Sequence, residues 1–189
     1  MADGALLQCD GVVAGYQGPV VGPVSFDVHR GEVLGLLGSN GSGKSTILGA
    51  ITGAARIFRG QVYKAPGIRL AHHRQHPVRP QELPLTGHDL VKLTGASKNP
   101  APAGARRLLD GRMDRLSGGQ FQIVQIWACL GGSADIVLLD EPTNNLDPGT
   151  MAMLVNLIRE GIDGRALLVV SHEASFIDAV CSRVVKVGP

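Results

Sequence analysis

The sequence lacks the features that would tie it directly to a membrane. No stretch approaches the roughly 18 consecutive apolar residues that a spanning helix needs. The N-terminal MADGALLQCD has no basic segment followed by a long apolar one, so no signal peptide is evident. We therefore expect a soluble protein, and we expect any membrane role to come through a partner.

Surplus charge, paired cysteines and internal repeats are also missing. Lysine and arginine number 18 against 16 aspartates and glutamates, and this balance gives no general case for a nucleic-acid binder. The sequence has three cysteines, Cys9, Cys129 and Cys181, and no two of them have CxxC spacing. Because their number is odd and none is paired in this way, we expect reduced thiols in a cytosolic protein. No internal repeat is visible, which excludes a second copy of the same domain within the chain.

What is present suffices for one domain with a full core, since 44% of the 189 residues are apolar. The runs LLQC and PVSFDV read as strands, and those at 33–37, 136–140 and 166–171 are typical of strands buried on both faces of a sheet. Helical spacing follows at 47–53 and 151–161. The second helix should turn one side to the core, with Met151, Leu154, Val155 and Ile158. This alternation predicts an α/β fold with a largely parallel sheet.

Residues 38–46, GSNGSGKST, fit the pattern GxxxxGK[ST] between a predicted strand and a predicted helix. Glycines in such a phosphate loop let successive backbone N–H groups close around a phosphate at a helix N-terminus. Lys44 would reach the β- and γ-phosphates, and the Ser45 hydroxyl would ligate Mg²⁺. The candidate nucleotide-binding residues here are Gly38, Ser39, Asn40, Gly41, Ser42, Gly43, Lys44, Ser45 and Thr46.

An acidic pair ends the predicted strand in IVLLDEP, residues 136–142. Asp140 is placed to hold Mg²⁺ through water, and Glu141 is the natural general base for an attacking water. A strand that ends in two acidic residues is weak evidence alone. Together with the phosphate loop it predicts nucleotide hydrolysis.

Residues 116–120, LSGGQ, resemble the signature motif of the ATP-binding cassette (ABC) superfamily, and the order of the other elements agrees with it. The resemblance implies a P-loop NTPase fold of the ABC type over nearly the whole chain, with ATP and Mg²⁺ as cofactors. In that family Ser117, Gly118, Gly119 and Gln120 cap the γ-phosphate of an ATP held by a second, facing cassette, as a helix N-terminus suits an anion. The implied partner is therefore another cassette, most simply a second copy of this chain.

The resemblance assigns further roles residue by residue. Tyr16 stands where the adenine-stacking aromatic falls, and Gln75 matches the glutamine that contacts Mg²⁺ and the attacking water. Asp147 matches the D-loop residue that faces the partner cassette, and His172 the switch histidine that bonds the γ-phosphate. An ordinary strand tyrosine and a satisfied core histidine are the plain alternatives. The implied catalytic residues are Glu141, His172 and Gln75, and the implied Mg²⁺ ligands are Ser45, Gln75 and Asp140.

Three departures from the family pattern stand out. After the signature, Ile123 and Ala128 replace the usual arginines, and Trp127 occupies a normally small position, which should change how this helix packs. HHRQ replaces the common apolar run before Gln75. The chain stops soon after His172, so we expect a minimal cassette without the usual closing strands and helices. Within one domain of residues 1–189, we expect a short inserted helical subdomain at about 75–115.

The run ELPLTGHDLVKLTG, residues 82–95, resembles cassettes of zinc and manganese uptake systems, although a helix capped by Thr86 would look similar. The resemblance implies a subunit that energises a membrane permease for divalent-metal import at the cytoplasmic face, fed by an extracytoplasmic metal-binding protein. The alternative is an ABC transporter for another small substrate. His72, His73 and His76 suggest a metal site, but that spacing needs a helix, so we expect solvated histidines at the permease contact.

Two other functions stay open. DEPTNNLD and VVSHEASF resemble soluble ABC proteins that act on ribosomes, but those have two cassettes and a long charged linker, and this chain has one cassette and no linker. The second open function is that of a cassette that binds ATP without hydrolysing it. Against it, the residues expected for hydrolysis are all present: Lys44, Ser117, Asp140, Glu141 and His172. We expect no nucleic-acid partner.

Overall fold

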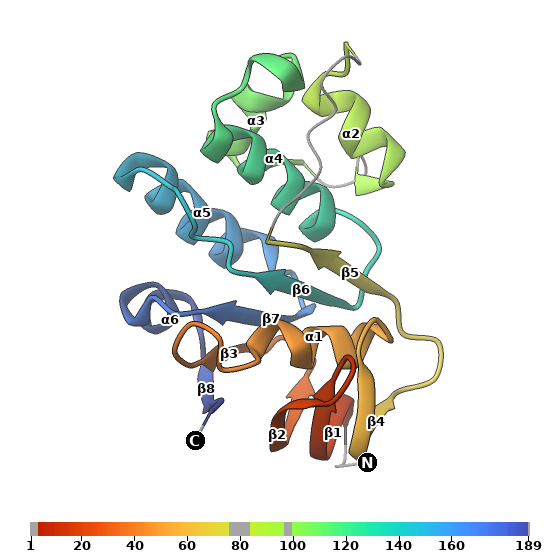
Figure 1. The fold of residues 1–189 in the computed structure, drawn as a ribbon. Helices are drawn as coiled ribbons and strands as arrows, with labels where there is room; N and C mark the ends of the chain where they lie inside the picture. The colour runs from red at the N-terminus through yellow and green to blue at the C-terminus, as the bar shows by residue number, and fades with distance from the viewer. Residues whose placement is uncertain (1–3, 76–83, 97–99, 189) are drawn as a thin grey trace.

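The computed structural model describes residues 4–75, 84–96 and 100–188, and these form two sheets with helices on both sides of the larger one (Figure 1). The larger sheet is parallel, in the order β5-β6-β7-β3-β8. Its strands are β5 (Leu70–His73), β6 (Ile136–Asp140), β7 (Ala166–Ser171), β3 (Val33–Leu37) and β8 (Arg183–Lys186). The fold class predicted from the sequence is therefore confirmed.

The smaller sheet is antiparallel, in the order β2-β1-β4. It consists of β1 (Ala5–Gly15), β2 (Pro19–His29) and β4 (Arg56–Lys64). Three residues join β1 to β2, and so short a connection permits a hairpin but not a parallel crossover. The sequence reading did not separate this sheet. It also named no strand at β4, β5 or β8, because polar residues leave each of these strands with no more than two consecutive apolar residues.

Each face of the parallel sheet has its own hydrophobic core, since side chains alternate along a strand. Leu139 and Val169 pack on the side of α4 (Gly118–Leu130), α5 (Pro148–Gly161) and α6 (Ala174–Val180). Leu138 and Leu168 pack on the other side, toward α1 (Lys44–Thr52) and the antiparallel sheet. This arrangement explains the consecutive apolar residues from which the central strands were predicted.

The two predicted helices are present. α1 is bounded by Gly43 and Gly53, both in the left-handed region, in agreement with the predicted end near Gly53. α5 starts after Asp147, and the predicted side does face the core. Leu154 and Ile158 are buried there, and Met151 and Val155 are partly buried. The prediction omitted Leu157, which is also buried in this core.

The helices α2 (Gly87–Leu93) and α3 (Ala103–Leu109) pack against α4, with a 3-10 turn at Met113–Arg115 before it. The unusual Trp127 is 4% exposed, and glycines make room for its ring. A β-carbon on Gly131 would lie 3.0 Å from the indole, and one on Gly161 would lie 3.4 Å from it. Ile123 and Ala128, which replace arginines, are buried as apolar residues should be. Within the described ranges no helix has the length and apolarity required to cross a bilayer.

Candidate active site

The phosphate loop follows β3 and runs into the first turn of α1, which begins at Lys44. The Lys44 Nζ donates hydrogen bonds to the carbonyl oxygens of Gly38 and Ser39, at 2.8 and 3.0 Å, and so closes the loop on itself. Two glycines are needed because the loop is tightly enclosed. A β-carbon on Gly38 would lie 2.3 Å from the Val187 carbonyl oxygen, and one on Gly43 would lie 2.4 Å from the β-carbon of Val21.

A hydroxyl and a carboxylate meet beside this loop. The Ser45 Oγ donates to Asp140 Oδ1 over 2.8 Å, which joins the first turn of α1 to the end of β6. Asp140 is 7% exposed. Oxygen ligands of this kind are those that Mg²⁺ prefers, so these two side chains could hold the metal ion of a bound nucleotide.

Glu141 lies at the centre of the site. One carboxylate oxygen is 3.5 Å from the Lys44 Nζ, and the other is 2.8 Å from the Nδ1 of His172, which follows β7. The Glu141 side chain is 7% exposed. Its backbone has a φ of 46°, in the left-handed region that few residues other than glycine adopt. Strained backbone of this kind concentrates at functional sites.

Two adjoining cavities lie at this site. The first, of about 330 Å³, brings the phosphate loop together with Gln75 and Glu141; its lining is Val20, Asn40, Gly41, Gly43, Lys44, Ser45, Thr46, Gln75 and Glu141. The second, of about 320 Å³, also contains Gln75 and adds Tyr16 and Asp140. Tyr16 is 60% exposed, so its ring is available for stacking. These residues fit ATP with Mg²⁺: a glycine cradle with backbone N–H groups, a lysine, and oxygen ligands beside them.

Ser117 and its neighbours do not join this cluster. Ser117 caps α4, accepting a bond from the Gln120 N–H while the Gln120 side chain accepts one from the Ser117 N–H. α4 packs on the face of the parallel sheet opposite to α1 (Figure 1). Gly118 leaves open space at this helix end, whereas a β-carbon on Gly119 would contact Leu146 and Thr150. The signature residues therefore line neither cavity of their own phosphate loop.

Asp147 is likewise separate from the cluster. Its side chain accepts hydrogen bonds from the Thr150 N–H and hydroxyl and so caps α5, and the hydroxyl bond is the chief cause that lowers its pKa. Asp147 is exposed to solvent. The structure thus unites Lys44, Ser45, Asp140, Glu141 and His172. Asp147 and the signature residues line neither of the cavities at this cluster.

The expectation of solvated histidines before Gln75 is wrong for His73. It is 3% exposed, and burial lowers its pKa to about 4. His72 and His73 are successive residues of β5, so their side chains point to opposite faces and do not share one metal ion. His76 and residues 82–83 of the ELPLT run lie outside the described residues. Within the described ranges, no group of three or more His, Cys, Asp or Glu residues could hold a metal.

One polar contact next to the site was not foreseen. The Gln122 Nε2, on α4, donates to the Pro142 carbonyl oxygen over 2.8 Å. The only sequence signal for this contact is that Gln122 lies two positions after the signature motif. Residues far apart in the chain meet here because α4 and β6 pack in the same hydrophobic core.

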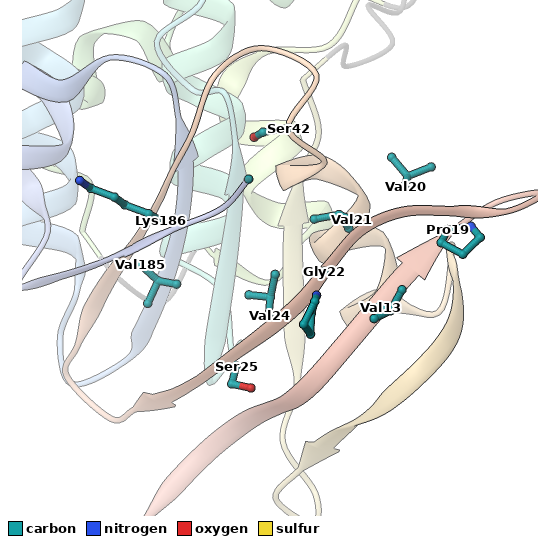
Figure 2. Close-up of a pocket in the computed structure, with 12 residues that line it drawn as sticks. Val13, Pro19, Val20, Val21, Gly22, Val24, Ser25, Ser42, Val185 and Lys186 are labelled. Carbon is teal, nitrogen blue, oxygen red and sulfur yellow. The ribbon is translucent and has the colours of Figure 1, made fainter.

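A larger cavity, of about 560 Å³, lies between β2 and residues 185–188 beside the phosphate loop (Figure 2). Its lining is dominated by valines and prolines, among them Val13, Val21 and Val24. The polar side chains in the lining are those of Ser25, Ser42 and Lys186. This composition offers no acid and base for hydrolysis, so the chemistry is assigned to the smaller cavities around Glu141.

Comparison with known proteins agrees with this geometry. The family described as ABC transporter matches residues 21–144. The zinc import ATP-binding protein ZnuC of Roseobacter denitrificans is 34% identical over 190 aligned positions, covering 96% of this chain and 74% of the relative. The protein of that name from Alkalilimnicola ehrlichii is 36% identical over 174, covering 88% and 67%.

Solved structures show the same fold. The ATP-binding subunit of an ABC transporter matches with a TM-score of 0.77 at 25% identity, covering 97% of this chain and 86% of the other. The RNase-L inhibitor matches with a TM-score of 0.78 at 28% identity, covering 95% of this chain but 36% of the other.

Proposed function

This chain belongs to the ABC transporter family, and from that premise we propose that it powers zinc import. As a member it is an ATP-binding ATPase that pairs with a second cassette and works with a membrane permease. One observation carries the assignment of activity: Lys44, Glu141 and His172 meet at the ends of the parallel strands, where open α/β sheets bind their ligands.

We assign the chemistry to residues of this cluster. ATP with Mg²⁺, when bound, supplies the phosphoanhydride bond that is cleaved. The phosphate loop and Lys44 would hold the β- and γ-phosphates, and Ser45 and Asp140, with Gln75, would hold the metal ion. The Glu141 carboxylate accepts a hydrogen bond from a water and orients it for attack. His172 keeps that carboxylate in position through its Nδ1 and is available to the γ-phosphate.

We assign the remaining residues to a facing cassette. Ser117 caps a helix end with open space at Gly118, and such an end attracts anions. Because the signature lines neither cavity of its own phosphate loop, it is suited to cap the nucleotide of a second copy. Asp147, exposed at the start of α5, would face the same partner, and Tyr16 would stack on the adenine. Two copies would thus enclose two nucleotides.

The substrate assignment follows the relatives that are named as zinc import proteins. Their similarity extends over most of this chain, whereas the RNase-L inhibitor is matched over about a third of its length. We therefore favour a metal importer over a ribosome-acting protein. The cassette would sit on the cytoplasmic face of the membrane, bound to its permease, with an extracytoplasmic metal-binding protein delivering the metal.

Affinity purification of the tagged protein from its own cells in mild detergent tests this function. A polytopic permease and a metal-binding protein should come with it, and membranes of those cells should show ATP hydrolysis that depends on zinc and is abolished by a zinc-selective chelator in the presence of excess Mg²⁺. The variant Glu141→Gln should keep the same partners but lose hydrolysis. Recovery of ribosomal proteins without a membrane subunit would overturn the proposal.

A further inference from the structure

The proposed function gives Gln122 no role, yet this residue bonds to the segment that carries the general base. Its Nε2 donates to the carbonyl oxygen of Pro142, the residue that follows Glu141, over 2.8 Å. We propose that Gln122 is a positioning residue that fixes Glu141 to the signature helix of the same chain. This inference rests on the proposed ATPase function and adds a coupling route to it.

The Pro142 carbonyl is not used by the turn in which it lies. Residues 141–144 are closed by a bond of 3.4 Å from the Asn144 N–H to the Glu141 carbonyl oxygen, and Leu146 bonds to Thr143 at 3.2 Å. Pro142 is buried, so its carbonyl oxygen needs a partner within the protein. Because the Glu141 backbone is left-handed at a φ of 46°, an outside bond to the next residue is a direct means of keeping that conformation.

A second contact ties the same helix to the far end of this segment. A β-carbon on Gly119 would lie 3.0 Å from Thr150 and 3.1 Å from Leu146, so the helix backbone rests directly on the start of α5. Gly119 and Gln122 are three residues apart and share one side of α4. The signature helix is therefore attached at both ends of the segment that runs from Glu141 to the first turn of α5.

The attachment has a consequence for catalysis. In the proposed pair of cassettes, the partner's nucleotide binds at Ser117, at the N-terminus of α4. A helix moves as a rigid unit, so the position that Ser117 takes is passed through Gln122 to Pro142 and Glu141. Glu141 would then be correctly aimed between Lys44 and His172 when the facing nucleotide holds the helix in place.

The test is the variant Gln122→Met, which removes the amide donor and keeps most of the volume. We expect kcat for ATP hydrolysis to fall by about 2- to 13-fold, the effect of one hydrogen bond of ordinary net strength, with KM for ATP unchanged. Gln125→Met on the same helix is the matched control. Its buried Oε1 has no hydrogen-bond partner within the described structure, so kcat should stay at the wild-type value. Equal melting temperatures would confirm that both variants fold.

Two further variants separate positioning from packing. Gln122→Lys keeps a donor within reach of the Pro142 carbonyl and should recover most of kcat. In a double-mutant cycle, Ser117→Ala should cost less in the Gln122→Met background than alone, because the route from Ser117 to Glu141 is already broken. An unchanged kcat in Gln122→Met, equal losses in the Lys and Met variants, or strict additivity with Ser117→Ala would overturn the inference. Absence of hydrolysis in the wild type would contradict the proposed function instead.

Discussion

The glycines of the phosphate loop allow backbone strain and steric exclusion to be measured separately. Gly41 and Gly43 both have a left-handed backbone, with φ of 79° and 90°. A β-carbon on Gly41 would meet nothing within 4 Å, whereas one on Gly43 would lie 2.4 Å from the β-carbon of Val21. Gly41→Ala therefore introduces strain alone, and Gly43→Ala introduces the same strain together with a steric overlap.

The expected magnitudes follow from these contacts. The left-handed conformation costs an alanine about 1–2 kcal/mol, which corresponds to a fall in melting temperature of roughly 2–8 °C for a domain of this size. The overlap with Val21 adds about 1–3 kcal/mol, because β2 or the start of α1 must move. That movement displaces the N–H groups at the mouth of the phosphate cavity, so Gly43→Ala should also weaken ATP binding at least tenfold more than Gly41→Ala.

Thermal unfolding and nucleotide titration of the two variants check this reasoning. Val21→Gly removes the β-carbon that Gly43→Ala would strike. The double variant should therefore be more stable than the sum of the two single changes predicts, by about 1–3 kcal/mol of coupling. Equal losses of stability and of affinity in Gly41→Ala and Gly43→Ala, or no coupling to Val21→Gly, would refute the argument.

Three other predictions follow from the structure. Glu141→Gln should lower hydrolysis by about 10²- to 10⁴-fold while the protein still binds ATP and forms an ATP-dependent dimer; full activity would remove Glu141 from its assigned role. The pKa of Asp27 is lowered from 3.8, first by the hydrogen bond from His29 and then by Arg183. The ionised Asp27 contributes fully to stability above pH 3.8, and this contribution is lost as the pH falls through the pKa of the folded state. His29→Leu should therefore reduce the loss of unfolding free energy between pH 7 and pH 3, as measured by urea titration. Trp127→Ala should cost about 3–5 kcal/mol of unfolding free energy, and a small loss would contradict the close packing of its buried ring.

Much of this protein could be predicted from the sequence because the relevant signals are local. The phosphate loop holds its glycines, Lys44 and Ser45 within nine successive residues, and the strand before it is apolar without interruption. These patterns predicted the parallel sheet, and the fold is confirmed. The roles assigned to Gln75, Glu141 and His172 stay predictions, although the structure places all three beside the phosphate loop.

Only the tertiary structure decided how distant segments meet. Nothing in the sequence says that the Glu141 carboxylate lies between Lys44 and His172, that Gln122 bonds to Pro142, or that Trp127 rests on two glycines. β4, β5 and β8 were missed because edge strands carry polar residues, and their pairing is set by neighbours elsewhere in the chain. His73 was expected in solvent but is buried, because burial depends on the helix that covers a strand rather than on the strand's own residues. Motifs such as the phosphate loop can be predicted because their residues are consecutive in the chain. Contacts between distant segments depend on how whole helices and strands pack.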